Sequence, residues 1–166
     1  WLPVSDDAVA DVGVAPATQK GLFAFGANSS GYVSISNLVS SSGVVASDTA
    51  GVGTVSASVA AASYGTDKAI FGYGTVAGGG YTSLTNLVSN QGVVAADVTG
   101  VGQARQSLAA SEYGGDKVAF AYGSETSAGN VSIKNLCSNT GVISADVTGV
   151  GTVRNLTAAA GYSQSA

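Results

Sequence analysis

The stretch Thr85-Asn-Leu-Val-Ser-Asn-Gln-Gly-Val-Val-Ala-Ala-Asp-Val-Thr-Gly-Val-Gly102 occurs three times in this chain of 166 residues, with small changes between copies. The first copy begins at Ser36 and the third at Lys134, so that equivalent positions lie 49 residues apart. A fixed period of this length indicates one supersecondary unit that is repeated along the chain and stacked on its neighbours. The repeat therefore predicts the architecture before any single strand is assigned.

Each unit contains three segments with the character of β-strands. The first is a short apolar and aromatic run that ends on Gly, and the second alternates apolar with polar residues, as expected of a strand with one buried face. A turn that ends on Gly leads into the third, because Gly supplies the positive φ of a tight hairpin. The first strands are expected at 21–26, 69–74 and 118–123, the second at 33–39, 82–88 and 131–137, and the third at 44–46, 93–95 and 142–144.

A fourth segment of each unit, at 55–64, 104–113 and 153–162, is rich in Ala and Ser. Helix propensity alone permits a helix here. We prefer a strand, because small side chains fit the crowded innermost position of sheets that radiate from a common axis.

Four short strands in a unit of this length are typical of a propeller blade. The motifs run from the small-residue strand through Tyr-Gly, Asp-Lys and the aromatic-Gly strand to Gly-Gln-Ala-Arg105, and this order resembles a Kelch-type blade. The repeated stretch itself is similar to repeats in virion and tail-associated proteins of aquatic bacteriophages. These resemblances imply an all-β, Kelch-like β-propeller located outside the cell or in a virion.

The resemblance covers Gly21 to Tyr162. It divides the chain into a lead-in arm or degenerate half-repeat, 1–20, and three four-stranded blade repeats, 21–68, 69–117 and 118–166. Propellers typically have about four to eight blades, so three do not close a ring. We therefore expect self-association, or further repeats outside this chain, to complete it. The strand at 153–162 fits the missing innermost strand of the first blade, on the same or the next chain.

Composition excludes several classes of function. Only 10% of the residues are charged and the net charge is -4, so nucleic acids and anionic membranes are poor partners. No apolar run is long enough to insert across a bilayer. The chain contains no His, which excludes His-based catalysis and His metal ligands. We expect no cofactor, no metal and no enzymatic activity. The first residue is Trp1 rather than Met, which fits a processed product or a segment of a longer chain.

Three sets of repeated polar residues have a structural interpretation beside a functional one. Asn37, Asn86 and Asn135 fall on the apolar face of their strands, where a buried amide must bond a neighbouring turn or repeat. The equivalent acids either form an acidic ring around a channel or cap a turn, and capping is preferred. The Asp-Lys loops are either ligand loops or strand-connecting turns, and turns are preferred. These acids are Asp48, Asp97 and Asp146, and the loops are 65–68 and 114–117.

Variable loops between the first and second strands offer the best candidates for ligand binding. They lie at 26–32, 74–81 and 123–130, and the Kelch resemblance places them on one face with 97–105 and 146–154. The larger side chains of that face are Tyr32, Tyr81, Arg105, Glu125 and Arg154. The sequence therefore predicts a structural or adhesive component of an extracellular or virion assembly. A glycan-binding module that uses this face is the alternative, since an exposed aromatic ring can stack on a sugar.

Overall fold

The computed structural model describes residues 20–162, and within this range it is all-β, as predicted. The predicted arm, apart from Lys20, lies outside the described residues. The strands are β1 (Gly21–Asn28), β2 (Gly31–Val39), β3 (Ser56–Ala57), β4 (Ala60–Tyr64), β5 (Lys68–Gly72), β6 (Thr75–Val76), β7 (Thr85–Val88), β8 (Ala109–Tyr113), β9 (Lys117–Ala121), β10 (Ser124–Glu125), β11 (Gly129–Asn130) and β12 (Lys134–Cys137).

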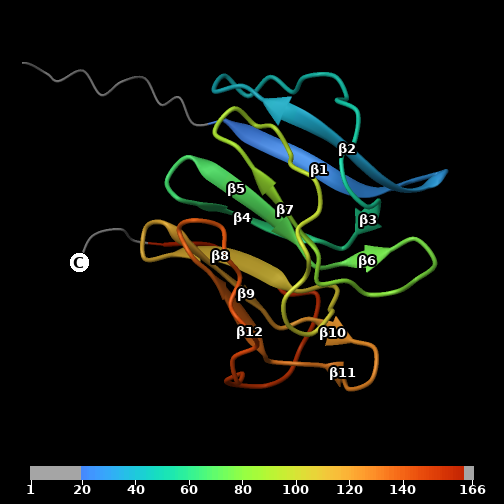
Figure 1. Ribbon diagram of the computed structural model, residues 1–166, viewed down its shortest axis with the longest axis vertical. Helices are drawn as coiled ribbons and strands as arrows, with labels where there is room; N and C mark the ends of the chain where they lie inside the picture. Colours follow the sequence, from blue (N-terminus) through green and yellow to red (C-terminus); the bar gives the residue numbers. More distant parts are fainter. Residues whose placement is uncertain (1–19, 163–166) are drawn as a thin grey trace, which may run out of the picture.

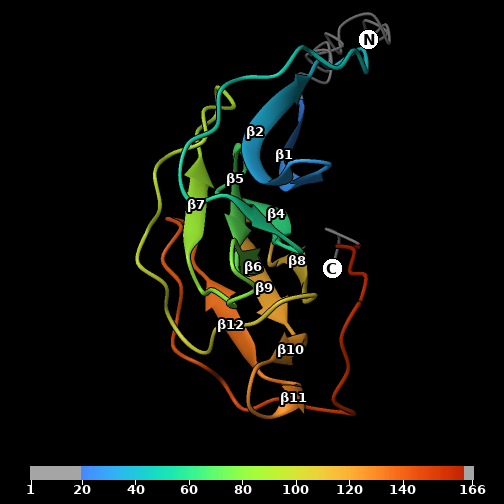
Figure 2. The same ribbon diagram turned by 90° about the vertical axis from the view of Figure 1, so that its right-hand side faces the viewer.

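Three principal antiparallel sheets lie one above another, and each of them is called a unit here (Figure 1). The strands β4 and β8 come from the end of the preceding predicted repeat, 21–68 and 69–117. The first unit has the pair β1–β2, the second has β4–β5–β7, and the third has β8–β9–β12. Two further two-stranded sheets, β3–β6 and β10–β11, lie beside the stack. The turned view in Figure 2 shows the same order, with the connections after β2, β7 and β12 running along one side. None of these sheets closes on itself.

The Ala-rich segments 55–64 and 104–113 contain strands rather than helices. Their strands β4 and β8 pair with β5 and β9 and each form one edge of their sheet. Ala60 is buried where one sheet packs on the next, so a small side chain is required at this position. The third segment, 153–162, has no strand in the structure, which corrects that part of the prediction.

The third predicted strand of every unit is shorter than expected, and so is the second predicted strand of the second and third units. In the first unit β2 is continuous, but β7 and β12 begin three residues after the predicted start. After Gly74 the chain leaves its sheet, because β6 pairs with β3 of the adjoining segment. The third strands at 44–46, 93–95 and 142–144 are reduced to single bridges, formed by Val45, Val94 and Ile143.

An aromatic residue with positive φ lies at the bulge within β1 and directly after β5 and β9. Phe25, Tyr73 and Tyr122 have φ of 64°, 62° and 64°, and each is followed by a Gly with φ above 100°. The left-handed conformation turns the ring out of the sheet toward the next unit. Tyr73 thereby packs on Phe120, with ring centroids 5.4 Å apart, and Phe25 packs on Phe71 at 5.5 Å.

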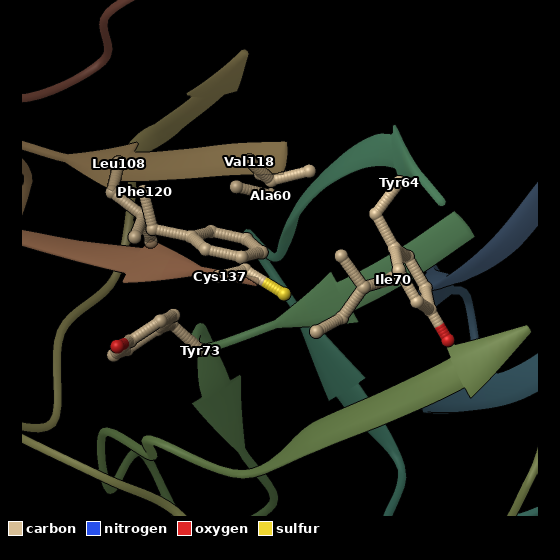
Figure 3. Close-up of a cluster of buried hydrophobic side chains, with 8 residues drawn as sticks. All are labelled: Ala60, Tyr64, Ile70, Tyr73, Leu108, Val118, Phe120 and Cys137. Atoms are coloured by element: carbon tan, nitrogen blue, oxygen red, sulfur yellow. The ribbon is translucent and has the colours of Figure 1, made fainter. Parts of the chain in front are cut away.

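The hydrophobic core consists of two layers between successive units. Figure 3 shows the larger layer, in which side chains of the second unit point toward side chains of the third. Its buried members are Ala60, Tyr64, Ile70, Tyr73, Leu108, Val118, Phe120 and Cys137. The smaller layer joins the first and second units and centres on Phe71, Val88 and Val94. Because both layers lie between repeats, each unit depends on its neighbour for burial of its apolar surface.

Candidate functional site

The structure divides the five candidate binding residues between buried and accessible positions. Arg105 is fully buried and Glu125 is 6% exposed. Tyr32 and Tyr81 are half-buried, at the start of β2 and in the loop after β6, and Arg154 is exposed. Burial leaves Arg105 no surface for contact with a ligand in this chain.

Arg105 lies at the junction of the second and third units. Its guanidinium carbon is 4.5 Å from the centroid of the Tyr73 ring, and Nη1 is 3.7 Å from the Asp146 carboxylate. Nη1 also donates to the carbonyl oxygen of Gln103 at 3.4 Å. Desolvation lowers the pKa of Arg105, and burial raises the pKa of Tyr73 to about 12. Arg105 is thus a buried cation between an aromatic ring and a carboxylate, and these contacts link the second unit to the third.

Gln103 joins Arg105 to Glu125. The side-chain amide of Gln103 donates to Glu125 at 2.8 Å, and its backbone N–H donates to Asp146 at 3.0 Å. Glu125 also accepts from the Ser127 hydroxyl and from the backbone N–H of Ala128. The carboxylate of Glu125 is therefore occupied by its own loop and by the preceding segment.

Tyr81 belongs to a separate group in the second unit. Its hydroxyl accepts a hydrogen bond from the Gln106 amide at 2.9 Å, and the Gln106 carbonyl accepts from the Thr75 hydroxyl. Arg154 lies over the Tyr122 ring of the third unit, with 3.8 Å between the guanidinium carbon and the ring centroid. The structure thus brings Arg105 and Glu125 together through Gln103, and it places Tyr81 and Arg154 in other groups.

A repeated Asn–Asp pair connects successive units. The amide of Asn86 donates to the Ala95 carbonyl at 3.1 Å and to Asp97 at 2.9 Å. Asp97 in turn accepts from the backbone N–H of Thr54 at 3.0 Å and from its hydroxyl at 2.6 Å. Thr54 belongs to the preceding repeat, so the pair fastens one unit to the next. The predicted structural role of the asparagines is confirmed.

The contacts of the repeated acids favour capping over an acidic ring. Asp97 and Asp146 each accept hydrogen bonds from a backbone N–H of the preceding repeat, at Thr54 and Gln103. Burial raises the pKa of Asp97, but hydrogen bonds from Thr54 and Asn86 outweigh this effect and hold the pKa below its ordinary value. The capping interpretation is correct in kind, although the capped turn belongs to the preceding unit. Sequence comparison of the repeats could have paired the Asn with the Asp, but not with Thr54.

The Asp-Lys loops are turns. Asp67 and Asp116 each form an ion pair with the adjacent Lys at 2.7 Å, and Asp116 also accepts from Asn139 at 2.9 Å. Hydrogen bonding to Lys117 is the main cause of the lowered pKa of Asp116. These contacts favour the turn interpretation of both loops.

Within residues 20–162 no group of three or more metal-ligating side chains comes together. No helix among these residues is long and apolar enough to cross a membrane. Cys137 is buried, and burial raises the pKa of its thiol to about 11, so it is a poor nucleophile at neutral pH. Comparison with protein-family models and with curated proteins found no match to this chain.

Proposed function

We propose that this chain is a non-enzymatic structural and adhesive component of an extracellular or virion assembly. In this proposal its units are three Kelch-like propeller blades of an incomplete ring. The supporting observation is that a recurring set of polar contacts connects one repeat to the next: Asn86, Asp97 and Thr54 repeat as Asn135, Asp146 and Gln103. A chain whose polar side chains are used in this way is organised for stacking units.

The solution mass of the chain over a range of concentrations tests this function. Because the core layers lie between units, we expect the end units to associate and the mass to rise above that of one chain. Electron microscopy of the associated fraction should then show rings or filaments of uniform width. A compact monomer of one chain mass at every concentration contradicts a structural role based on self-association.

A glycan-binding module is the second candidate function. Tyr32 and Tyr81 lie beside the variable loops and remain partly accessible, and the Tyr81 hydroxyl is fixed by Gln106. A ring held in this manner can stack on a sugar at low entropic cost. A glycan array with the intact protein tests this candidate, and Tyr32→Ala should weaken any binding, whereas Tyr113→Ala on β8 should leave it unchanged.

A further inference from the structure

The C-terminal segment 154–162 is placed like the beginning of another repeat. The Gly123 N–H donates to the Arg154 carbonyl at 3.0 Å, as the Gly74 N–H donates to the Arg105 carbonyl at 2.7 Å. The Leu156 N–H likewise donates to Ser107 at 2.8 Å. These bonds hold the segment beside the third unit, in the position that the chain leading into β8 occupies beside the second.

The local conformation of the segment agrees with this placement. Leu156 has φ of 51°, and the equivalent residues Ser107 and Ser58 have φ of 54° and 53°. Arg154 lies over Tyr122 as Arg105 lies over Tyr73. The chain at 154–156 thus follows the course of the chain that leads into β4 and β8, although no strand follows it in the structure. Among the described residues the segment pairs with no strand, and Leu156 remains 82% exposed.

Strand β1 offers the edge with which such a segment can pair. Within residues 20–162 it pairs only with β2, whereas β5 and β9 each pair with an inner strand as well. Phe23 on β1 is 65% exposed, but its equivalents Phe71 and Phe120 are 7% and 0% exposed because a preceding unit covers them. The repeat interfaces inside the chain therefore show that another unit is what fits this face.

We propose that segment 154–162 of one copy pairs with β1 of a second copy, so that copies join head to tail. This inference rests on the proposed structural function. The register follows from β4–β5, in which Ala61 pairs with Phe71 and Tyr64 pairs with Lys68. The equivalent pairs between copies are Ala159 with Phe23 and Tyr162 with Lys20.

The same junction supplies the Asp48 carboxylate with the donors that its equivalents have. Asp97 and Asp146 accept hydrogen bonds from the preceding repeat, and Arg105 lies 3.7 Å from Asp146. Among the described residues Asp48 accepts only from Asn37, at 2.7 Å. The repeat equivalents of the missing donors are Thr152, which matches Thr54, and Arg154, which matches Arg105. In the junction these two residues of one copy bind Asp48 of the next.

Two observations favour a second copy over the chain's own first residues. Aligning Lys20 with Lys68 places Asp6 at the position of Thr54, and a second carboxylate there would repel Asp48. The space around Gly151 is the second observation, because it is open where Gly53 and Gly102 contact a following unit. A Cβ at Gly53 or Gly102 would collide with the carboxylate of the following unit, whereas among the described residues a Cβ at Gly151 would meet only the Tyr122 hydroxyl, at 3.9 Å. The copies would form a ring if the rotation closes and a filament if it does not.

Disulfide cross-linking tests the register. All variants carry Cys137→Val, because Val stands at the equivalent positions 39 and 88. A chain with Ala159→Cys is mixed with a chain with Phe23→Cys and oxidised mildly, since directly opposed strand residues have Cβ atoms about 4.5–5.5 Å apart. We expect a linked dimer of the two variants. The matched control replaces Phe23→Cys by Ser30→Cys, at an exposed turn, and should give little product.

Charge reversal tests the Asp48 contact, because both side chains are exposed in the free chain. Asp48→Arg or Arg154→Asp alone should weaken self-association by about tenfold or more, and the chain with both changes should recover it. If the wild-type chain associates but the cross-link is absent and both reversals have no effect, this junction is wrong while the structural function stands. A wild-type chain that stays monomeric overturns both. A chain with both cysteines that links only within itself, even at high concentration, assigns β1 to its own C-terminus and also overturns the junction.

Discussion

Asn86 explains why a polar side chain recurs on the apolar face of a strand. It is 6% exposed and bonds the Ala95 carbonyl and the Asp97 carboxylate. Both acceptors follow it in the same repeat, and Asp97 holds Thr54 of the preceding one. The amide therefore orients the carboxylate that makes the inter-unit contact. A hydrophobic side chain at this position would leave the Ala95 carbonyl and the carboxylate without this donor.

Replacing Asn86 tests this role. Asn86→Ala should lower the free energy of unfolding by about 1–3 kcal/mol, because it removes one hydrogen bond to a carboxylate and one to a backbone carbonyl. Chemical unfolding followed by intrinsic tyrosine fluorescence measures the change. Asn37→Ala is the matched control, since Asp48 makes no inter-unit contact among the described residues of a single chain. Equal losses at the two positions would show that the amide acts only within its own repeat.

Cys137 is a core residue with a titratable group. It is 1% exposed, and burial raises the pKa of the thiol from 9.0 to about 11. The unfolded chain therefore ionises first, so the stability that comes from the neutral buried thiol is complete below pH 9 and is lost as the pH rises toward 11.

Cys137→Val should remove that alkaline loss. Unfolding midpoints measured between pH 8 and pH 11 should fall less in the variant than in the wild-type chain, and the two should agree near neutral pH because Val fits the same position in the other repeats. A thiol reagent should label wild-type Cys137 only as fast as the protein opens. Rapid labelling of the folded chain would contradict the buried assignment.

The strands show which local features the sequence determines. Alternation and Gly-ended runs predict β1 and β2, because these features depend on neighbours in the chain. The strands β4 and β8 were predicted for another reason, the small side chains of their segments, since local propensity also permits a helix there. The early end of pairing beside Gly74 is different, because the Gly74 N–H donates to Arg105, 31 residues away. A contact over that separation leaves no local pattern. The positive φ of Tyr73 was also not predicted, because a bulky residue rarely adopts this conformation and no local pattern marks it.

Substitution of Gly74 tests whether the backbone conformation after β5 is required. It has φ of +106°, and a Cβ there would lie 2.5 Å from the Ala57 carbonyl oxygen and 2.8 Å from Val59. Gly74→Ala should therefore cost more than the roughly 1–2 kcal/mol of a left-handed Ala alone. The matched control is Gly79→Ala, which also has positive φ, at +82°, but has nothing within 4 Å. Thermal melting of both variants measures the difference, and similar melting temperatures would mean that the backbone at Gly74 moves freely.

The architecture of the chain was more predictable than its candidate site. The period of 49 predicts stacked all-β units, and the structure has them. Arg105, which recurs as Arg154, was expected at a binding face because the Kelch resemblance places it beside the variable loops, and the sequence does not show that Tyr73 and Asp146 enclose it. Recurrence identifies residues that matter to every unit. It does not separate those that face a ligand from those that face the next repeat.

Stability should be unequal along the stack of units. The second unit contacts a neighbour through both of its faces, and the larger core layer lies between it and the third. The first unit has an uncovered face at Phe23 and, within the described residues, an unpaired edge at β1. Local opening requires less free energy where fewer apolar contacts are broken.

Hydrogen exchange measured at two protein concentrations tests this inequality. In dilute protein the amides of β5 and β9 should exchange most slowly and those of β1 and β2 fastest. If copies join through β1, raising the concentration should slow exchange in β1 and in segment 154–162, while β5 changes little, because only the first two gain partners. Asp48→Arg serves as the control, since it should keep the dilute pattern at both concentrations. Uniform protection at low concentration, or slowing spread evenly over all units, would mean that the three repeats open together and that the stack has no exposed end.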